Sequence, residues 1–102
     1  MNDIDPRSVA ELGDSAYLLD VREVDEYVAT RAVGAVNVPL STLQARVDEI
    51  PRDRAVYVIC QSGGRSAQAT AWLEGQGVQA INVLGGTGAW VMAGLPSERG
   101  AA

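Results

Sequence analysis

Short apolar runs alternate along this chain with amphipathic or small-residue stretches, and this alternation constrains the fold more than any other feature. The strongest run is AVYVIC (55–60), and AYLLDV (16–21) and VQAINVLG (78–85) repeat the pattern on either side. A strand that is apolar at successive positions is buried on both faces, as in a parallel sheet that helices cover. The alternation therefore predicts an α/β fold of three layers, with a mostly parallel central sheet and helices on both faces.

The stretches between these runs carry helix signals. Pro6 is suited to the first turn of a helix, and Ser41 is a plausible N-cap ahead of an apolar face formed by Leu43, Val47 and Ile50. Gly77 is expected to end the helix that follows the cysteine. The predicted helices cover residues 6–12, 22–31, 41–50, 65–76 and 86–94, and a further short strand covers residues 34–39.

The length of 102 residues fits one domain, residues 1–102, with a core over about 4–96 and a frayed tail at 97–102. No apolar run approaches the roughly 18 residues that a membrane span needs, so no membrane partner is expected. The N-terminus carries acids and lacks the basic-then-apolar pattern of a signal peptide, which makes the cytoplasm the expected location.

Composition removes several classes of function. The net charge is −5 with no basic cluster, which disfavours nucleic-acid binding. The chain has no histidine, and all eight basic residues are arginine, so histidine-dependent catalysis, histidine zinc sites and lysine Schiff bases are excluded. A single cysteine excludes an internal disulfide and a multi-cysteine metal cluster. Neither a metal nor a cofactor is expected, and any catalysis must use a thiol, carboxylates, hydroxyls, arginines and main-chain amides.

The segment CQSGGRS (60–66) places that cysteine directly after the strongest predicted strand. Gly63 and Gly64 are expected to adopt positive φ and turn successive N–H groups inward as an anion-binding nest. A free thiol has a pKa of about 8.5, and the following helix N-terminus together with Arg65 is expected to lower it. The carboxyl ends of parallel strands share one edge, so Asp20 and the pair Gly85-Gly86 are expected beside Cys60.

The spacing from Cys60 to Arg65 decides between two chemistries of such a loop. Cysteine phosphatases need five residues between the cysteine and the arginine, whereas this chain has four. The shorter loop suits a sulfur atom better than a phosphate and favours sulfane sulfur transfer through a persulfide, which needs no general base. Phosphatase or arsenate reductase activity is the disfavoured alternative, and a small buried hydrophobic cysteine is the structural one.

The segments LLDVREVDEY, GAVNVPL, VYVICQSGGRS, VLGGTGAW and AGLP, in this order, resemble a single-domain rhodanese-like sulfurtransferase. The resemblance spans about residues 4–96 and implies a five-stranded, mostly parallel sheet with a cysteine that carries a persulfide. It implies that Cys60 is the catalytic nucleophile. The positions that match the family's active-site loop and anion cradle are Gln61, Ser62, Gly63, Gly64, Arg65 and Ser66.

Asp20 and Arg22 match the family's DVRE motif and are expected to support the site. Asp20 is expected to anchor Arg22 or the amides of a neighbouring loop, with a helix cap as the purely structural alternative. Arg22 would contact an anionic substrate or pair with Glu23 or Glu26. The acidic run Glu23, Asp25 and Glu26 is predicted to be a solvated helix face. Trp72 and Trp90 are predicted to belong to the core, with Trp90 bordering the site as the alternative.

Two departures from the family pattern affect the expected function. Where the family usually has GHIPGA, this chain has TRAVGA (30–35), which predicts a reshaped turn. Gln61 and Ser62 are neutral, which predicts weak affinity for dianionic thiosulfate and favours a protein persulfide or another small sulfur donor, with a thiol or cyanide as acceptor. A non-catalytic or redox-sensing domain that binds a protein partner is the alternative function.

Overall fold

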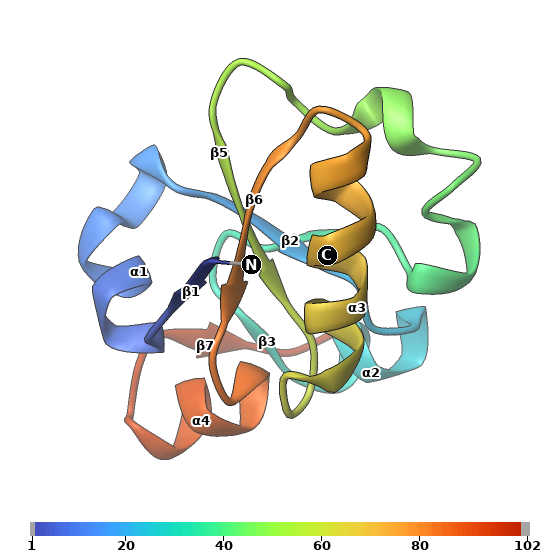
Figure 1. The fold of residues 1–102 in the computed structure, drawn as a ribbon. Helices are drawn as coiled ribbons and strands as arrows, with labels where there is room; N and C mark the ends of the chain where they lie inside the picture. The colour runs from blue at the N-terminus through green and yellow to red at the C-terminus, as the bar shows by residue number, and fades with distance from the viewer. Residues whose placement is uncertain (1, 101–102) are drawn as a thin grey trace.

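The computed structural model describes residues 2–100, and its centre is a five-stranded sheet in which every neighbouring pair is parallel (Figure 1). Its order is β1-β6-β5-β2-β4, with bounds β1 (Asn2–Ile4), β2 (Tyr17–Asp20), β4 (Val36–Asn37), β5 (Ala55–Ile59) and β6 (Gln79–Val83). The α-helices are α1 (Pro6–Leu12), α2 (Val24–Ala29), α3 (Gly64–Gly75) and α4 (Gly86–Met92). The predicted α/β fold with a parallel sheet is confirmed.

The central strands send alternate side chains into two buried clusters, one on each face of the sheet. Val56 and Val58 of β5 lie in the first cluster, which also holds residues of α3 and of the segment 40–50. Ile59 lies in the second cluster, together with residues of α1 and α4. On β2, Leu19 and Leu18 divide in the same way. Because successive strand residues face opposite sides and both sides are buried, the strands read as continuous apolar runs.

Both tryptophans contribute to these clusters, as predicted. Trp90 is buried in the second cluster, and the half-buried Trp72 packs against the first. The predicted helix at 65–76 begins one residue earlier, at Gly64, and Gly77 follows its end with a φ of +85°. No helix in the part of the chain from residue 2 to residue 100 is both long and apolar enough to cross a membrane.

The predicted helix at 41–50 is wrong. The segment instead forms two short 3₁₀ helices, η2 (Leu40–Thr42) and η3 (Val47–Glu49), and a further one, η1 (Gly13–Ser15), follows α1. Leu43 and Ile50 do reach the first cluster, but from an irregular backbone. The hydroxyl of Ser41 does not cap a helix and donates to Glu23 Oε1 at 2.8 Å. The contacts of Leu43 and Ile50 with the core, together with those of the partly buried Val47, fix the path of this segment and override its weak helical preference.

The expected frayed tail is also corrected for residues 97–100. Strand β7 (Ser97–Glu98) pairs antiparallel with β3 (Arg31–Ala32) in a separate two-stranded sheet. The buried Arg31 side chain donates to the carbonyl oxygen of Gly100 at 2.6 Å and lies over the ring of Tyr27, 4.6 Å from its centroid. The segment TRAVGA that departs from the family pattern thus contacts residues 96–100, while residues 101–102 lie outside the described residues.

Candidate active site

The carboxyl ends of β2, β5 and β6 bring three distant segments together. Asp20 is the last residue of β2, Cys60 follows β5, and Gly85-Gly86 follow β6 and lead into α4. The amide of Val21 donates to Ile59 O at 3.0 Å, and the amide of Thr87 donates to Cys60 O at 2.7 Å. The predicted convergence on one sheet edge is therefore confirmed.

The sulfur of Cys60 lies inside the turn that joins β5 to α3. The amide of Gly63 donates to Sγ at 3.1 Å, and the hydroxyl oxygen of Ser66 lies 3.3 Å from Sγ. Gly63 adopts a φ of +109°, a region that favours glycine, and this conformation aims its N–H at the sulfur. Gly64 was expected to share that conformation but is the first residue of α3 and has no positive φ.

The charge state of this thiol follows from two opposed effects. Burial raises the pKa of Cys60, because only 1% of the residue is exposed. The hydroxyl and amide of Ser66 and the amides of Gly63 and Ser62 lower the pKa more strongly, so it falls below its usual value. The loop therefore stabilises the thiolate form of Cys60, relative to a free thiol, through main-chain amides and one hydroxyl.

Arg65 pairs with a carboxylate that the sequence analysis did not assign to it, while its guanidinium also interacts electrostatically with Cys60. Its two terminal nitrogens donate to the two carboxylate oxygens of Glu26 at 2.6 and 2.8 Å. The hydrogen bonds from Arg65 hold the pKa of Glu26 at about 2, so this carboxylate is charged at neutral pH. Of the predicted solvated face, Glu23 and Asp25 are exposed, whereas Glu26 is only partly exposed and forms this ion pair. Its partner lies 39 residues away, so no local pattern indicates the pair.

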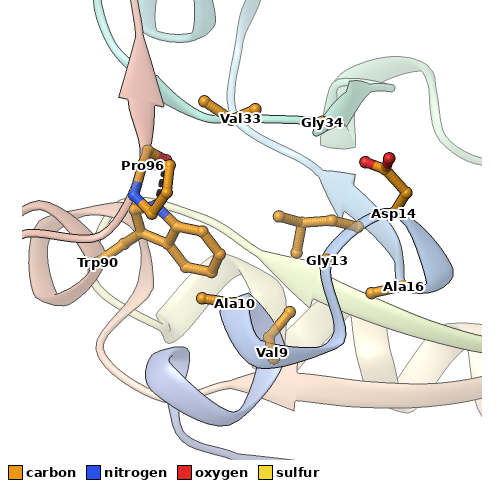
Figure 2. Close-up of a pocket in the computed structure, with 10 residues that line it drawn as sticks. Val9, Ala10, Gly13, Asp14, Ala16, Val33, Gly34, Trp90 and Pro96 are labelled. Carbon is orange, nitrogen blue, oxygen red and sulfur yellow. Dashed lines mark hydrogen bonds between the residues drawn. The ribbon is translucent and has the colours of Figure 1, made fainter.

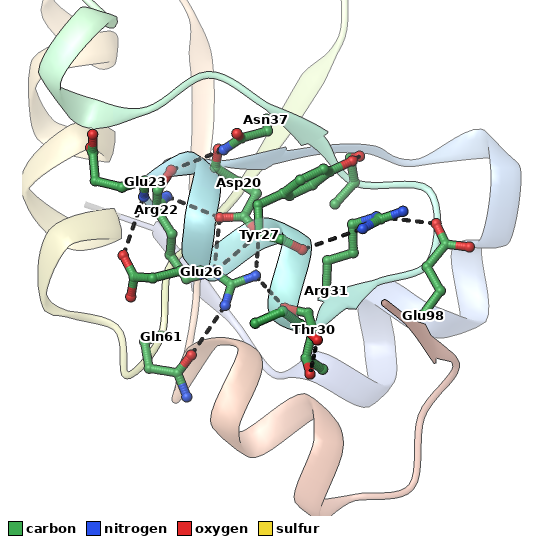
Figure 3. A network of polar contacts seen from close by, with 12 residues as sticks. Asp20, Arg22, Glu23, Glu26, Tyr27, Thr30, Arg31, Asn37, Gln61 and Glu98 are labelled. Carbon is green, nitrogen blue, oxygen red and sulfur yellow. Dashed lines mark hydrogen bonds and ion pairs between the residues drawn. The ribbon is translucent and has the colours of Figure 1, made fainter. Parts of the chain in front are cut away.

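Arg22 pairs with Asp20 and with neither Glu23 nor Glu26. Arg22 Nη2 donates to Asp20 Oδ2 at 2.8 Å, and the amide of Arg22 donates to Oδ1 at 2.9 Å. The two side chains are 2% and 0% exposed. Figure 3 shows that the same guanidinium reaches Gln61 Oε1, to which Nη1 donates at 3.2 Å. This buried pair therefore joins the end of β2 to the active-site loop.

The start of α4 is hydrogen-bonded to the backbone of the loop after β5, a detail beyond the predicted proximity of Gly85-Gly86 to Cys60. Besides the bond from Thr87 to Cys60, the amide of Gly88 donates to Gln61 O at 3.0 Å. Gly86 has a φ of +60°, and a Cβ atom there would lie 2.4 Å from Cys60 O. Only glycine permits this approach of the two backbones.

Asn82 lies behind Ser66 and is a second contributor that was not predicted. The Ser66 hydroxyl donates to Asn82 Oδ1 at 2.6 Å, and both residues are buried. A polar residue inside the apolar strand VQAINVLG is the signal that could have identified it, since buried polar groups require partners. Ser66 thus has one hydroxyl proton and more than one acceptor within reach.

Replacing Ser66 with alanine is expected to raise the pKa of Cys60, because a hydrogen bond to the ionised sulfur is lost. Hydrogen bonds to charged groups contribute about 1.5–3 kcal/mol, so uptake of sulfur or of an alkylating reagent near neutral pH should slow roughly tenfold. The thiolate absorbance of the single cysteine against pH measures the change. Ser15→Ala is the matched control, because its exposed hydroxyl donates to Leu12 O. An unchanged titration in Ser66→Ala would contradict the assignment.

Two hollows elsewhere on the molecule do not contain the thiol. The one in Figure 2, about 200 Å³, is lined mainly by small and apolar residues between α1, α4 and the turn at 33–34. Trp90 lies at its edge with its indole N–H bound to Pro96 O at 2.7 Å, so this residue borders that hollow. The other, about 290 Å³, lies between the segment 40–44 and α3. The residues that line these two hollows therefore do not include those of the loop after β5.

Comparisons with known proteins agree with this geometry. The family model of the Rhodanese-like domain matches residues 6–93. A sulfurtransferase of Allochromatium vinosum is 38% identical over 94% of this chain and 94% of that protein. The thiosulfate sulfurtransferase GlpE of Actinobacillus succinogenes is 35% identical over 83% of this chain and 78% of that protein. The crystal structure of a rhodanese-related protein from Thermoplasma volcanium has a TM-score of 0.91 at 31% identity, covering 96% of this chain and 98% of that one.

Proposed function

This chain belongs to the family of rhodanese-like domains, and on that premise we propose that it is a sulfurtransferase that carries sulfane sulfur as a persulfide of Cys60. The observation that carries the proposal is the position of Sγ, 3.1 Å from the Gly63 amide and 3.3 Å from the Ser66 hydroxyl oxygen. The Gly63 amide donates to the sulfur, and the Ser66 hydroxyl, which accepts from the thiol, donates to the sulfur once the thiol is ionised; both bonds stabilise negative charge on the sulfur.

The reaction has two displacements. The Cys60 thiolate attacks the sulfane sulfur of a donor, a new S–S bond forms, and the donor's leaving group departs with the electron pair of the broken bond. From thiosulfate the leaving group is sulfite, and from a persulfide it is a thiolate. An acceptor thiolate or cyanide then attacks the terminal sulfur, and Cys60 leaves as a thiolate. Neither displacement requires a general base, which suits a chain without histidine.

The residues of the loop have different roles in this proposal. Gly63 and Ser66 hold the charge of the sulfur, while the exposed Gln61 and Ser62 form the side from which a donor approaches. Gln61 is held by Arg22, and Arg22 by Asp20, so this pair acts as support for the loop.

Mass spectrometry of the intact protein tests the proposal. After incubation with thiosulfate or a low-molecular-weight persulfide, the protein should gain the mass of one sulfur atom, and cyanide or dithiothreitol should remove it. Cys60→Ser should gain nothing, since the chain has a single cysteine. Sulfur transfer that persists in Cys60→Ser, or a wild-type protein that takes sulfur from no donor, would overturn the proposal.

The low exposure of Cys60 favours a second candidate, a non-catalytic domain that binds a protein partner. Only 1% of the residue is exposed, which leaves little of the thiol open to a small donor in this conformation of the loop. In that case no donor would load the protein with sulfur, although the absorbance titration would still report a lowered thiol pKa.

A further inference from the structure

The two guanidinium groups that border the active-site loop are each neutralised by a carboxylate. Within the described part of the chain, Arg65 belongs to the loop 60–66 and is paired with Glu26, while Arg22 donates to Gln61 of the loop and is paired with Asp20. We infer that Glu26 is a specificity-determining residue: by cancelling the charge of Arg65, it makes the site select singly charged sulfur donors, such as persulfides, over dianionic thiosulfate. The inference rests on the proposed function and deepens it.

Of the two ion pairs, only that of Glu26 and Arg65 can lose one charge without leaving the other charge buried in the interior. Arg22 and Asp20 are 2% and 0% exposed, whereas the side chains of Arg65 and Glu26 are 37% and 32% exposed. A buried pair cannot release its arginine without leaving an uncompensated charge in the interior. The half-exposed Arg65 also interacts electrostatically with Cys60, so the net charge of this pair contributes to the potential that a donor meets at the sulfur.

Glu26 is also fixed in place from its own helix. Its Oε1 atom accepts a hydrogen bond from the amide of Glu23 at 3.2 Å, as part of the capping box that begins α2. Two separate groups, the Glu23 amide and the Arg65 guanidinium, therefore hold one carboxylate. Arg65 cannot readily exchange this bidentate partner for a donor, because a fork of two parallel hydrogen bonds matches a carboxylate geometrically.

Glu26→Gln tests the inference, because it removes the charge while keeping a side chain that reaches Arg65. For thiosulfate, kcat/KM is expected to rise about tenfold through a lower KM, as expected for a dianion that gains one uncompensated cation in its site. For benzenethiosulfonate, a monoanionic donor, the rise should be about threefold, since the interaction with the same cation scales with the donor's charge. The gain for thiosulfate should shrink as ionic strength increases.

Glu49→Gln is the matched control. Glu49 also forms a bidentate pair, with Arg46 at 2.9 and 2.9 Å, and its loss changes the net charge of the protein by the same amount. Its charge acts on Tyr17, the first residue of β2, at the opposite edge of the sheet from Cys60. Neither donor should respond to Glu49→Gln, and the double variant Glu26→Gln/Arg65→Gln should lose the gain. Equal responses of Glu26→Gln and Glu49→Gln would overturn the inference.

A binding measurement separates this inference from the proposed function. Calorimetric titration of thiosulfate into Cys60→Ser, alone and combined with Glu26→Gln or Glu49→Gln, requires no sulfur transfer. About tenfold tighter binding only with Glu26→Gln supports the role of Glu26 even if the wild-type protein transfers no sulfur. Binding that is equal in all three proteins, or absent from all three, overturns it even if transfer through Cys60 is demonstrated.

Discussion

Asp20→Ala is expected to lower the free energy of unfolding by about 3–5 kcal/mol, because it leaves the charge of Arg22 buried without its partner. Asp20 accepts hydrogen bonds from both the amide and the guanidinium of Arg22, and neither side chain has access to solvent. The guanidinium would retain its bonds to Gln61 and to the carbonyl oxygen of Thr30, but neither acceptor carries a charge. Urea-induced unfolding followed by tryptophan fluorescence measures the change.

The double variant Asp20→Ala/Arg22→Met is the control for this prediction. It removes the stranded charge and restores much of the side-chain volume, so it should be more stable than Asp20→Ala alone. Sulfur uptake by the double variant should still be slower than in the wild type, since Arg22 no longer holds Gln61. A cost below about 1 kcal/mol for Asp20→Ala would show that the pair does not behave as a buried one.

Gly86→Ala is expected to cost about 2–5 kcal/mol, the sum of a clash with the loop backbone and an unfavourable left-handed conformation. The new methyl group would lie 2.4 Å from Cys60 O and 2.7 Å from Gln61 C, both main-chain atoms that cannot rotate away. Relief of the clash requires α4 and the loop to separate, which lengthens the bonds from Thr87 and Gly88. Sulfur uptake by Cys60 should therefore fall together with stability.

Gly94→Ala distinguishes the clash from the conformational cost. Gly94 has a φ of +71°, close to the +60° of Gly86, but a Cβ atom there would meet nothing within 4 Å. Its substitution should cost only about 1–2 kcal/mol and leave sulfur uptake unchanged. Unfolding curves and uptake rates of the two variants, measured together, decide the point. Equal costs for both would mean that the loop backbone yields to the added methyl.

Much of the fold could be predicted because strands that are buried on both faces are continuous apolar runs in the sequence. The runs 16–21, 55–60 and 78–85 contain β2, β5 and β6, and the helices α1, α3 and α4 begin and end within two residues of their predicted bounds. The edge strand β1, with the sequence NDI, has exposed positions and therefore no apolar pattern. Strands β3 and β7 have two residues each and exist because they pair with one another.

The candidate site likewise consists of residues that are close in the sequence, which could be predicted, and residues from other elements, which could not. Cys60, Gly63 and Ser66 lie within one turn of chain, so their spacing along the sequence indicates how they meet around the sulfur. Glu26 and Asn82 reach the loop from other elements, 39 residues before Arg65 and 16 residues after Ser66. A pattern read along the chain holds no information on such pairs, and for Arg65 it gave no indication of the carboxylate of Glu26.

The sequence by itself determined which strands are buried, which turn holds the thiol, and which catalytic groups are available, because these depend on neighbouring residues and on composition. The tertiary structure alone decided the long-range contacts. It paired Arg65 with Glu26 and brought Gly86 against the backbone of Cys60, whereas the pairing of Arg22 with Asp20, two residues apart, was already among the predictions. Charge pairing and backbone contact depend on distances in space, and those distances exist only after the sheet has brought the strand ends together.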